Sequence, residues 1–446
     1  MKPMDVLQIG APAGFSGKKR VAAPGEAGED RIPSPKTDGA ALAPRTDYGR
    51  RTASFGEAID IVARLAAPSA AESVDLAAAS GRVLASPVIA ARTAPGSAVS
   101  AMDGYAVRDA DLACAPTRLS VVGRIFAGDS PPQWALPRGC CARVFTGAPL
   151  PIGADRVVVQ EDVEALASAA RIERRPTGRR HIRAAGSDFR AGDRLLDPGQ
   201  VVSPQALIAA AGADVARLVV HQRPRVSIVS TGDELGEPGA ERRPGAIPES
   251  VSFGVEAMAE QWGAEVVGRR RIGDDRAALE RAAKAALAEA GIVVTIGGAS
   301  VGERDLAKAM FEPFGLRLAV RRIDMRPGKP TWIGRAAGRI VVGLPGNPAA
   351  ALVAARLFLA PLIAAASGRP AADAWRWLPM PLVSPLSPHG DRETFVRGRS
   401  EARGAAPLVD QDSSSQKALA EADLLIRIRP EAVALAPGDL VEVLRF

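Results

Sequence analysis

Four short loops in the second half of the chain carry residues that could bind a phosphate and a divalent cation. The first, residues 297–302, follows the apolar run at 292–296 and precedes a helix-like stretch that begins at Asp305. Glycines let backbone N–H groups approach a phosphate, and a helix N-terminus favours negative charge. The order of strand, glycine-rich turn and helix predicts an anion cradle, and the alternative is a purely structural turn of the kind common in α/β proteins.

The other three loops also follow short apolar runs. They read Ser-Thr-Gly-Asp-Glu at 230–234, Pro-Gly-Lys-Pro at 327–330 and Leu-Pro-Gly-Asn-Pro at 344–348. Prolines on both sides fix the backbone around Lys329 and hold its ammonium in one direction, which favours an anion-binding role. Asn347 and Pro348 fit the N-cap and the first position of a helix, and a helix start is compatible with an anion site.

Acidic residues near these turns are the candidate ligands of a cation. Asp233, Glu234, Asp274 and Asp305 each lie just after an apolar run or at a predicted helix start. A carboxylate at such a position also serves as an ordinary N-cap, and this alternative stays open for each of them. Together with Lys329 they predict a site for a phosphorylated ligand and Mg²⁺, because Mg²⁺ is held by a few carboxylates plus phosphate oxygens.

The elements that position these loops alternate between strands and helices from about 223 to 368. Strands are expected at 226–229 and 292–296, and helices at 251–262 and after Asp274 or Asp275. This alternation predicts a doubly wound, mostly parallel α/β sheet with helices on both faces, and ligands of such sheets bind at the carboxyl ends of the strands. All four loops are expected to leave from that edge and to converge on one pocket.

The remainder of the chain predicts a multidomain protein of the α/β plus β class. The N-terminal segment is rich in Pro, Gly, Ala and charge, so it cannot bury enough apolar surface to fold. Short β-rich runs punctuated by Gly and Pro predict two small β domains. The expected parts are a disordered extension at 1–51, a mixed domain at 52–99 and 179–222, an inserted β domain at 100–178, the α/β domain at 223–368, and a C-terminal β domain at 375–446.

Composition argues against several classes of partner. Aromatic residues make up only 4%, and the net charge of +7 comes from scattered arginines, so we expect small anionic ligands and no nucleic acid. The three cysteines are too few and too badly spaced for a zinc site or a disulfide framework. We find no apolar run that reaches the length of a membrane span and no secretory signal, so we expect no membrane partner and a cytoplasmic enzyme.

Six motifs, taken in order, coincide with those of a known family. Two of them precede the four loops: Ser-Ala-Met-Asp-Gly-Tyr-Ala-Val-Arg at 100–108, and Thr-Gly-Ala-Pro at 146–149 followed by Gly-Ala-Asp at 153–155. Over residues 52–446 the set resembles the MoeA-type molybdopterin molybdenumtransferases, the family that includes the gephyrin E domain. The resemblance implies a homodimer that transfers molybdenum from molybdate to the dithiolene sulfurs of adenylylated molybdopterin. AMP is released and Mg²⁺ assists.

The resemblance also implies roles for individual residues. Those assigned to the chemistry are Asp103, Asp188, Glu234, Asp274, Asp305 and Lys329. Those expected to contact the pterin substrate are Thr146, Thr231, Gly232, Gly297, Gly298, Ser300, Gly302, Pro345, Gly346, Asn347 and Pro348. Those expected to hold the cation are Asp233, Asp274 and Asp305. Asp103 lies in a different domain from the four loops, so we expect it to act across a cleft from the partner subunit.

The chain departs from the family's pattern at five positions. Ser187 stands where Glu is usual, and Glu249 and Val251 lie in Pro-Glu-Ser-Val where the family has Tyr-Asp-Ser/Thr-Asn. Ile296 and Ala350 replace serines, which removes two hydroxyl donors from the expected anion pocket. A divergent module that binds or delivers molybdopterin or the finished cofactor without inserting metal is therefore the alternative function. A gephyrin-like scaffold is a third reading, which no residue specifically favours.

Overall fold

The computed structural model describes residues 52–241, 243–298, 306–388 and 390–446, all within one compact unit. The predicted extension at 1–51 lies outside the described residues, and so do the predicted site residues Ser300, Gly302 and Asp305.

Antiparallel strand pairs and two helices form the segments on either side of the inserted sheet. The pairs are β1 (Ala71–Asp75) with β12 (Arg217–His221), β2 (Val88–Ile89) with β11 (Arg194–Leu196), and β3 (Val99–Ser100) with β10 (Ile182–Arg183), and the helices are α2 (Leu76–Ala79) and α3 (Pro204–Gly212). Their buried side chains, among them Leu84 and Val220, form one small core. β12 then runs through residues 222–224 into the α/β sheet.

Helix α1 (Phe55–Leu65) begins with a capping box. Ser54 Oγ accepts the backbone N–H of Glu57, and the Glu57 carboxylate accepts the backbone N–H of Ser54. The helix buries Phe55, Ala58 and Val62 in the same core as one face of the α/β sheet.

The inserted region is a six-stranded sheet in the order β7-β4-β6-β5-β9-β8. Apolar side chains from its two faces form two separate clusters, which include Tyr105 and Leu119 in one and Ala106 and Val144 in the other. Its elements are β4 (Gly104–Val107), η2 (Asp109–Leu112), β5 (Thr117–Ile125), β6 (Cys140–Val144), β7 (Arg156–Val159), η3 (Gln160–Asp162), β8 (Glu164–Ala165) and β9 (Ala169–Ile172).

The α/β sheet has the order β16-β13-β17-β21-β20-β18, with the first four strands parallel and the last two antiparallel to their neighbours. Its strands are β13 (Arg225–Thr231), β16 (Glu265–Ile272), β17 (Ile292–Ile296), β18 (Arg317–Val320), β20 (Trp332–Ala336) and β21 (Arg339–Leu344). The chain leaves β13 for β16 on one side and then returns past β13 to β17 on the other. The strand order therefore reverses between β13 and β17, the point at which doubly wound sheets bind ligands.

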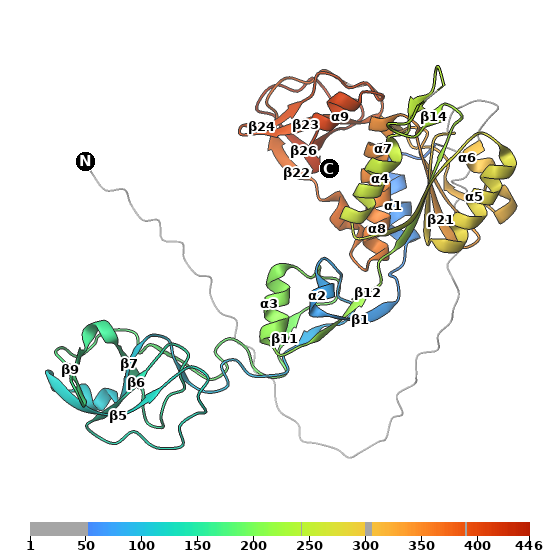
Figure 1. Ribbon diagram of the computed structural model, residues 1–446. Helices are drawn as coiled ribbons and strands as arrows, with labels where there is room; N and C mark the ends of the chain where they lie inside the picture. The colour runs from blue at the N-terminus through green and yellow to red at the C-terminus, as the bar shows by residue number, and fades with distance from the viewer. Residues whose placement is uncertain (1–51, 242, 299–305, 389) are drawn as a thin grey trace, which may run out of the picture. The chain divides into compact units, whose positions relative to one another are not determined.

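Helices cover both faces of this sheet, as predicted (Figure 1). One face carries α1, α4 (Val251–Gln261), α7 (Pro348–Ala354) and α8 (Ala360–Ala366), and the other carries α5 (Arg276–Glu289) and α6 (Leu306–Ala309). The turns η4 (Glu312–Phe314) and η6 (Ala371–Trp375) and the small parallel pair β14 (Leu235–Gly236) and β15 (Ile247–Pro248) complete the region.

One long apolar helix contradicts the expectation that the chain contains no apolar run of membrane-spanning length. Helix α7, a π-helical turn η5 (Ala355–Leu359) and α8 run on as residues 348–366, long and apolar enough to cross a membrane by length and composition. The expectation that no apolar run reaches that length was therefore wrong. Of its apolar window 94% is buried inside the protein, where it forms part of the core.

The C-terminal region is a third six-stranded sheet, with β24 paired at the side of β23. Its elements are β19 (Met325–Arg326), β22 (Leu378–Pro381), β23 (Glu393–Glu401), β24 (Gly404–Pro407), α9 (Gln416–Glu421), β25 (Leu424–Ile428) and β26 (Leu440–Arg445). β19 precedes the loop at 327–330, which then enters the antiparallel strand β20. This loop therefore reaches the carboxyl edge of β21 by entering the α/β sheet, and the expectation that it leaves a strand of the α/β sheet was wrong.

Candidate active site

A cavity of about 610 Å³ opens at the carboxyl edge of the α/β sheet, at the point where the strand order reverses. Ser230 of β13 pairs with Ile296 of β17, and Ile296 pairs with Leu344 of β21, so the loops that follow these three strands start side by side. Predicted residues that line the cavity are Thr231, Glu234, Gly297, Gly298, Pro345, Gly346, Asn347 and Pro348. The structure therefore brings together eight side chains or backbone segments that were predicted to act together.

Gly297 and Gly298 allow the loops after β13 and β17 to approach closely. Both have left-handed backbones, with φ of 91° and 64°. A Cβ on Gly297 would lie 2.6 Å from the carbonyl oxygen of Thr231, and a Cβ on Gly298 would lie 3.0 Å from the Cβ of Ala307. The N–H of Gly297 already donates to the Leu344 carbonyl at 3.2 Å, so the function of this glycine is close approach rather than donation to a ligand.

Thr231 carries a hydroxyl that the described residues leave unpaired. Its side chain is 4% exposed, and its Oγ1 has no hydrogen-bond partner among them. A Cβ on Gly298 would lie 3.2 Å from this oxygen, so the hydroxyl sits against the glycine turn at the cavity wall. Buried polar groups are almost always paired in folded proteins, so this hydroxyl points to a ligand.

The acidic residues after β13 and β16 form one connected group. Asp233 Oδ1 accepts the backbone N–H of Asp274 at 3.0 Å, which ties the two loops together. Asp275, not Asp274, caps helix α5 by accepting the N–H of Ala278. The capping alternative is thereby removed for Asp274, whose exposed carboxylate has no capping function. Glu234 lines the cavity from the same loop as Asp233.

Among the residues the structure describes, no three His, Cys, Asp or Glu side chains gather closely enough to hold a metal by themselves. Asp233 and Asp274 lie together, whereas the third predicted ligand, Asp305, lies outside the described residues. Carboxylate oxygens suit Mg²⁺, which is commonly bound through one or two carboxylates plus the phosphates of its substrate. The donor chemistry of this pair therefore fits Mg²⁺.

Lys329 lines a second cavity, of about 670 Å³, that adjoins the first. The two cavities share Pro330, Pro345 and Asn347 as walls. Arg326 and Arg392 also line the second cavity, so three cations face it. The expectation that all four loops converge on one pocket was therefore wrong. The sheet edge is divided into a pocket beside the glycine turn and a basic pocket beside Lys329.

The C-terminal sheet contributes wall residues that the sequence analysis did not assign. Ser414 and Gln416 line the first cavity, and Gln411, Asp412 and Ser413 line the second. Asn347 occupies the N-cap position of α7, but its side-chain amide donates to Ser413 Oγ at 2.8 Å instead of capping the helix. The polar run Asp-Gln-Asp-Ser-Ser-Ser at 410–415 was the available signal.

Four of the five departures from the family's pattern line these cavities, namely Glu249, Val251, Ile296 and Ala350. Ile296 lines the first cavity and Ala350 the second, and both are buried, so each presents an apolar surface. Glu249 also lines the first cavity and is 5% exposed. Its carboxylate accepts the N–H of Ser252 at 2.9 Å and hydrogen-bonds Ser252 Oγ, so it is fixed in place by the start of α4.

Asp103 and Thr146, both predicted site residues, meet in the inserted sheet. Asp103 Oδ1 accepts the backbone N–H of Thr146 at 2.7 Å and its hydroxyl at 2.8 Å. These hydrogen bonds, the backbone one first, hold the pKa of the Asp103 carboxyl below its usual value. Asp103 is therefore held as a carboxylate.

Asp188 occupies an exposed loop before β11, where its N–H donates to the Ala94 carbonyl at 3.1 Å. Asp103, Thr146 and Asp188 are not among the described residues that line the two cavities at the sheet edge.

Comparison with family models covers most of the chain. Residues 53–213 match the MoeA N-terminal region (domain I and II), residues 227–365 match a model described as "Probable molybdopterin binding domain", and residues 379–446 match the MoeA C-terminal region (domain IV). The loops after β13, β17 and β21 all begin within the second match.

Curated relatives and a solved structure extend the match to whole proteins. The chain is 36% identical over 348 residues to a molybdopterin molybdenumtransferase from a Nostoc species, covering 76% of this chain and 79% of the relative. It is 34% identical over 381 residues to molybdopterin molybdenumtransferase 2 of Mycobacterium tuberculosis, covering 83% and 94%. A crystal structure of the molybdopterin biosynthesis MoeA protein from Pyrococcus horikoshii matches with a TM-score of 0.74 at 28% identity, covering 89% of this chain and 99% of the other. This chain belongs to the molybdopterin molybdenumtransferase family.

Proposed function

We propose that this chain is an enzyme that inserts molybdenum into molybdopterin during molybdenum cofactor biosynthesis. Relatives that are 36% and 34% identical to it over the aligned residues carry that activity in their names. The observation that carries the proposal is the unpaired, buried Thr231 hydroxyl at the glycine turn, in the cavity where the sheet reverses its order. A phosphate of the pterin substrate would accept a hydrogen bond from it.

The proposed substrates are adenylylated molybdopterin and molybdate. Two Mo–S bonds form and one Mo–O bond breaks, and the departing oxygen leaves as water with the two thiol protons. Water then cleaves the phosphoanhydride and AMP is released. We place the pterin phosphate in the first cavity and molybdate in the second, because Lys329, Arg326 and Arg392 supply the positive charge that an oxyanion requires.

Asp233 and Asp274 are the residues that would hold Mg²⁺. Bound there, the cation would neutralise phosphate charge during cleavage of the phosphoanhydride. The Asp233 carboxylate has a second function that needs no metal, since it holds the Asp274 backbone in place through Oδ1. Within the described part of the chain, neither its other oxygen nor the Asp274 carboxylate has another hydrogen-bond or ion-pair partner, so these oxygens would bind the cation. Glu234, on the same loop, is placed to orient an attacking water.

Asp103 is proposed to complete the site of the partner subunit in a homodimer. Hydrogen bonds from Thr146 keep the Asp103 carboxylate ionised and hold it in one orientation. This suits a carboxylate that would extend into the pocket of the partner subunit. We further propose that Asp188 acts in the reaction, that the enzyme works in the cytoplasm and that the domain boundaries follow the five predicted segments.

The direct test is release of AMP. Purified protein is given adenylylated molybdopterin and Mg²⁺, and AMP is measured before and after molybdate is added. Molybdate-dependent AMP release that falls when Thr231 is changed to Val, with the protein still folded, supports the proposal. AMP release that does not depend on molybdate, or that Thr231→Val leaves unchanged, contradicts it.

The second candidate is a module that binds or delivers molybdopterin without inserting metal. It is favoured by Ile296 and Ala350, which present apolar surface where relatives are expected to place hydroxyls. Under this function the chain would bind the pterin tightly, measured by its fluorescence, and would release no AMP at any molybdate concentration.

A further inference from the structure

A smaller cavity, of about 250 Å³, lies where the chain enters the α/β sheet. β12 leads into β13 through residues 222–224, and the cavity forms around that connection. Hydrogen bonds connect His221, at the end of β12, to two other wall residues. The N–H of His221 donates to the Val83 carbonyl at 2.8 Å, and the Arg82 guanidinium donates to the His221 carbonyl at 2.8 Å. The proposed active site uses none of these residues.

Two buried polar atoms at this cavity have no hydrogen-bond partner within the described chain. One is Oγ of Ser367, a residue that is 6% exposed, and the other is Nε of Arg369. The Asp373 carboxylate approaches Arg369 Nε only to 3.6 Å, outside the geometry of a hydrogen bond. Two orphaned donors in one small cavity point to an acceptor that the chain does not supply.

The charge of the cavity specifies the sign of that acceptor. Arg82, Arg223 and Arg369 line it, against the single carboxylate of Glu260. The Arg82 guanidinium is already bonded to Glu72 and to a carbonyl, whereas Arg223 is exposed and forms no ion pair in the part of the chain that the structure describes. The guanidinium of Arg369 is held over the ring of Trp262 at 5.1 Å, which fixes its direction.

The size of the cavity suits a small ligand. Drug-sized ligands occupy pockets of about 300 to 1,000 Å³, so this cavity falls below that range. An anion that accepts hydrogen bonds on several sides matches a hydroxyl and two guanidinium groups.

We propose that this junction cavity binds a tetrahedral oxyanion of phosphate size. Ser367 and Arg369 are the buried donors, and Arg223 is the exposed cation that completes the site. The proposal stands apart from the proposed function, because the site is formed by other residues at the amino ends of the parallel strands.

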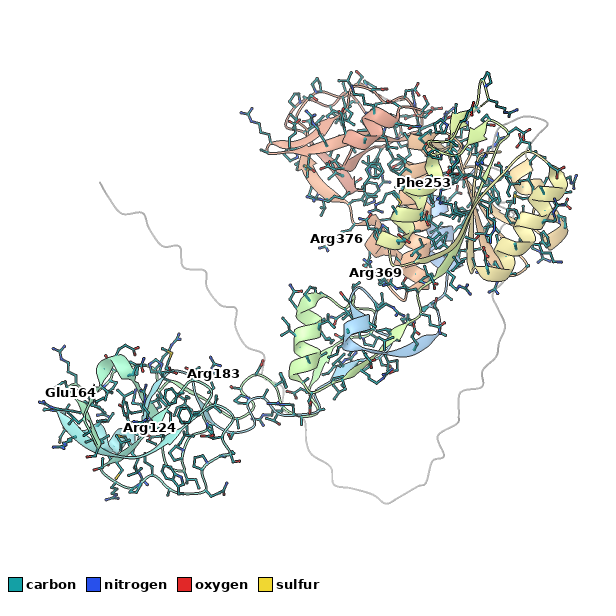
Figure 2. All side chains as sticks on the ribbon, viewed as in Figure 1. Arg124, Glu164, Arg183, Phe253, Arg369 and Arg376 are labelled. Atoms are coloured by element: carbon teal, nitrogen blue, oxygen red, sulfur yellow. The ribbon has the colours of Figure 1, made fainter. Side chains whose placement is uncertain are left out.

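Inorganic phosphate is the first probe, added to the full chain while binding is followed by calorimetry and by the phosphate-dependent rise in Tm. Ser367→Ala and Arg223→Gln should each weaken phosphate binding about tenfold, because each removes one donor to a charged ligand. Since the Ser367 hydroxyl has no partner among the described residues, Ser367→Ala should not lower the Tm measured without phosphate. Arg376→Gln is the matched control, because it removes one exposed positive charge from a neighbouring residue that does not line the cavity (Figure 2).

Lys329→Ala separates the two basic sites. Junction binding should persist in this variant with the same affinity. Phosphate binding that is lost in Lys329→Ala but unchanged in Ser367→Ala and Arg223→Gln belongs to the proposed active site and overturns the proposal. Absence of binding, or equal weakening by Arg376→Gln, also overturns it. Molybdate, used as a second probe, should show the same dependence on Ser367 and Arg223 at this site.

Discussion

The two edges of the α/β sheet are proposed to bind negatively charged groups by different means. At the carboxyl edge, two glycines in left-handed conformations bring two loops within contact of each other, and no lysine or arginine is among the described residues that line the first cavity. At the amino edge, a smaller cavity is lined by arginine side chains and a serine. A site shaped by backbone fails when a methyl group is added, whereas a site made of side chains fails when a charge is removed.

The largest effect is expected from Gly297→Ala. The new Cβ would lie 2.6 Å from the Thr231 carbonyl oxygen, so the loops after β13 and β17 must separate. A displacement of about 1 Å at a reacting group can cost about a hundredfold in rate, so AMP release should fall by at least about that factor.

Gly338→Ala is the control for this variant. Gly338 has a similar φ of 77°, but a Cβ there meets open space. It should cost about 1 to 2 kcal/mol in stability for the left-handed backbone and leave AMP release unchanged. If both variants lower the rate equally, loss of stability explains the effect and the carboxyl edge is not special.

Mixing variants of Asp103 and Lys329 tests whether the proposed active site at the carboxyl edge is formed by one subunit or by two. Asp103→Asn and Lys329→Ala homodimers are each expected to be nearly inactive. After subunit exchange, half of the dimers are mixed, and each mixed dimer carries one intact composite site of two. About one quarter of the activity should therefore return. Inactive mixtures, with exchange verified by differently tagged subunits, would show that Asp103 and Lys329 act in the same subunit.

Adding hydroxyl donors would make the carboxyl edge more like the amino edge. Ile296→Ser together with Ala350→Ser should lower the molybdate concentration for half-maximal AMP release by roughly thirtyfold, at about 1 kcal/mol per hydrogen bond. Ile296 is also a core residue, so its truncation leaves a void and is expected to lower stability by about 2 to 4 kcal/mol.

Ile296→Ala with Ala350 unchanged, and Ile296→Ala with Ala350→Ser, provide the matched comparison, since they create the same void with fewer hydroxyls. Equal molybdate requirements in all of these variants would show that other groups bind the oxyanion.

The smallest effect concerns pH. Thr146→Val removes the hydroxyl donor to Asp103 but keeps the backbone N–H, which makes the larger contribution to lowering the pKa. The pKa of Asp103 should therefore rise part of the way back to its usual value. Because the carboxylate is the active form, the loss of AMP release on the acid side should begin at higher pH. Thr146→Ser, which keeps the hydroxyl, should leave the acid limb in place.

Local signals predicted the elements and the first cavity well. The capping box at Ser54, the Asp275 cap of α5 and the buried strand before Gly297 all depend on neighbours in the chain, which a sequence displays directly. The division of the sheet edge into two cavities could not be predicted from the sequence. It depends on the antiparallel direction of β20 and on the hydrogen bond between Asn347 and Ser413, which are 66 residues apart. The arginines of the junction cavity had no periodic or motif signal, since they meet only through folding.

The helix at 348–366 has a mechanical consequence for both edges. It begins at the proline-rich loop of the proposed active site, and Ser367 and Arg369 of the junction cavity follow directly after its end. Its 19 residues make a rod about 28 Å long, and 94% of its apolar window is enclosed by packed side chains. Because this helix runs without a break from one cavity to the other, a shift of the helix along its axis would move wall residues of both cavities.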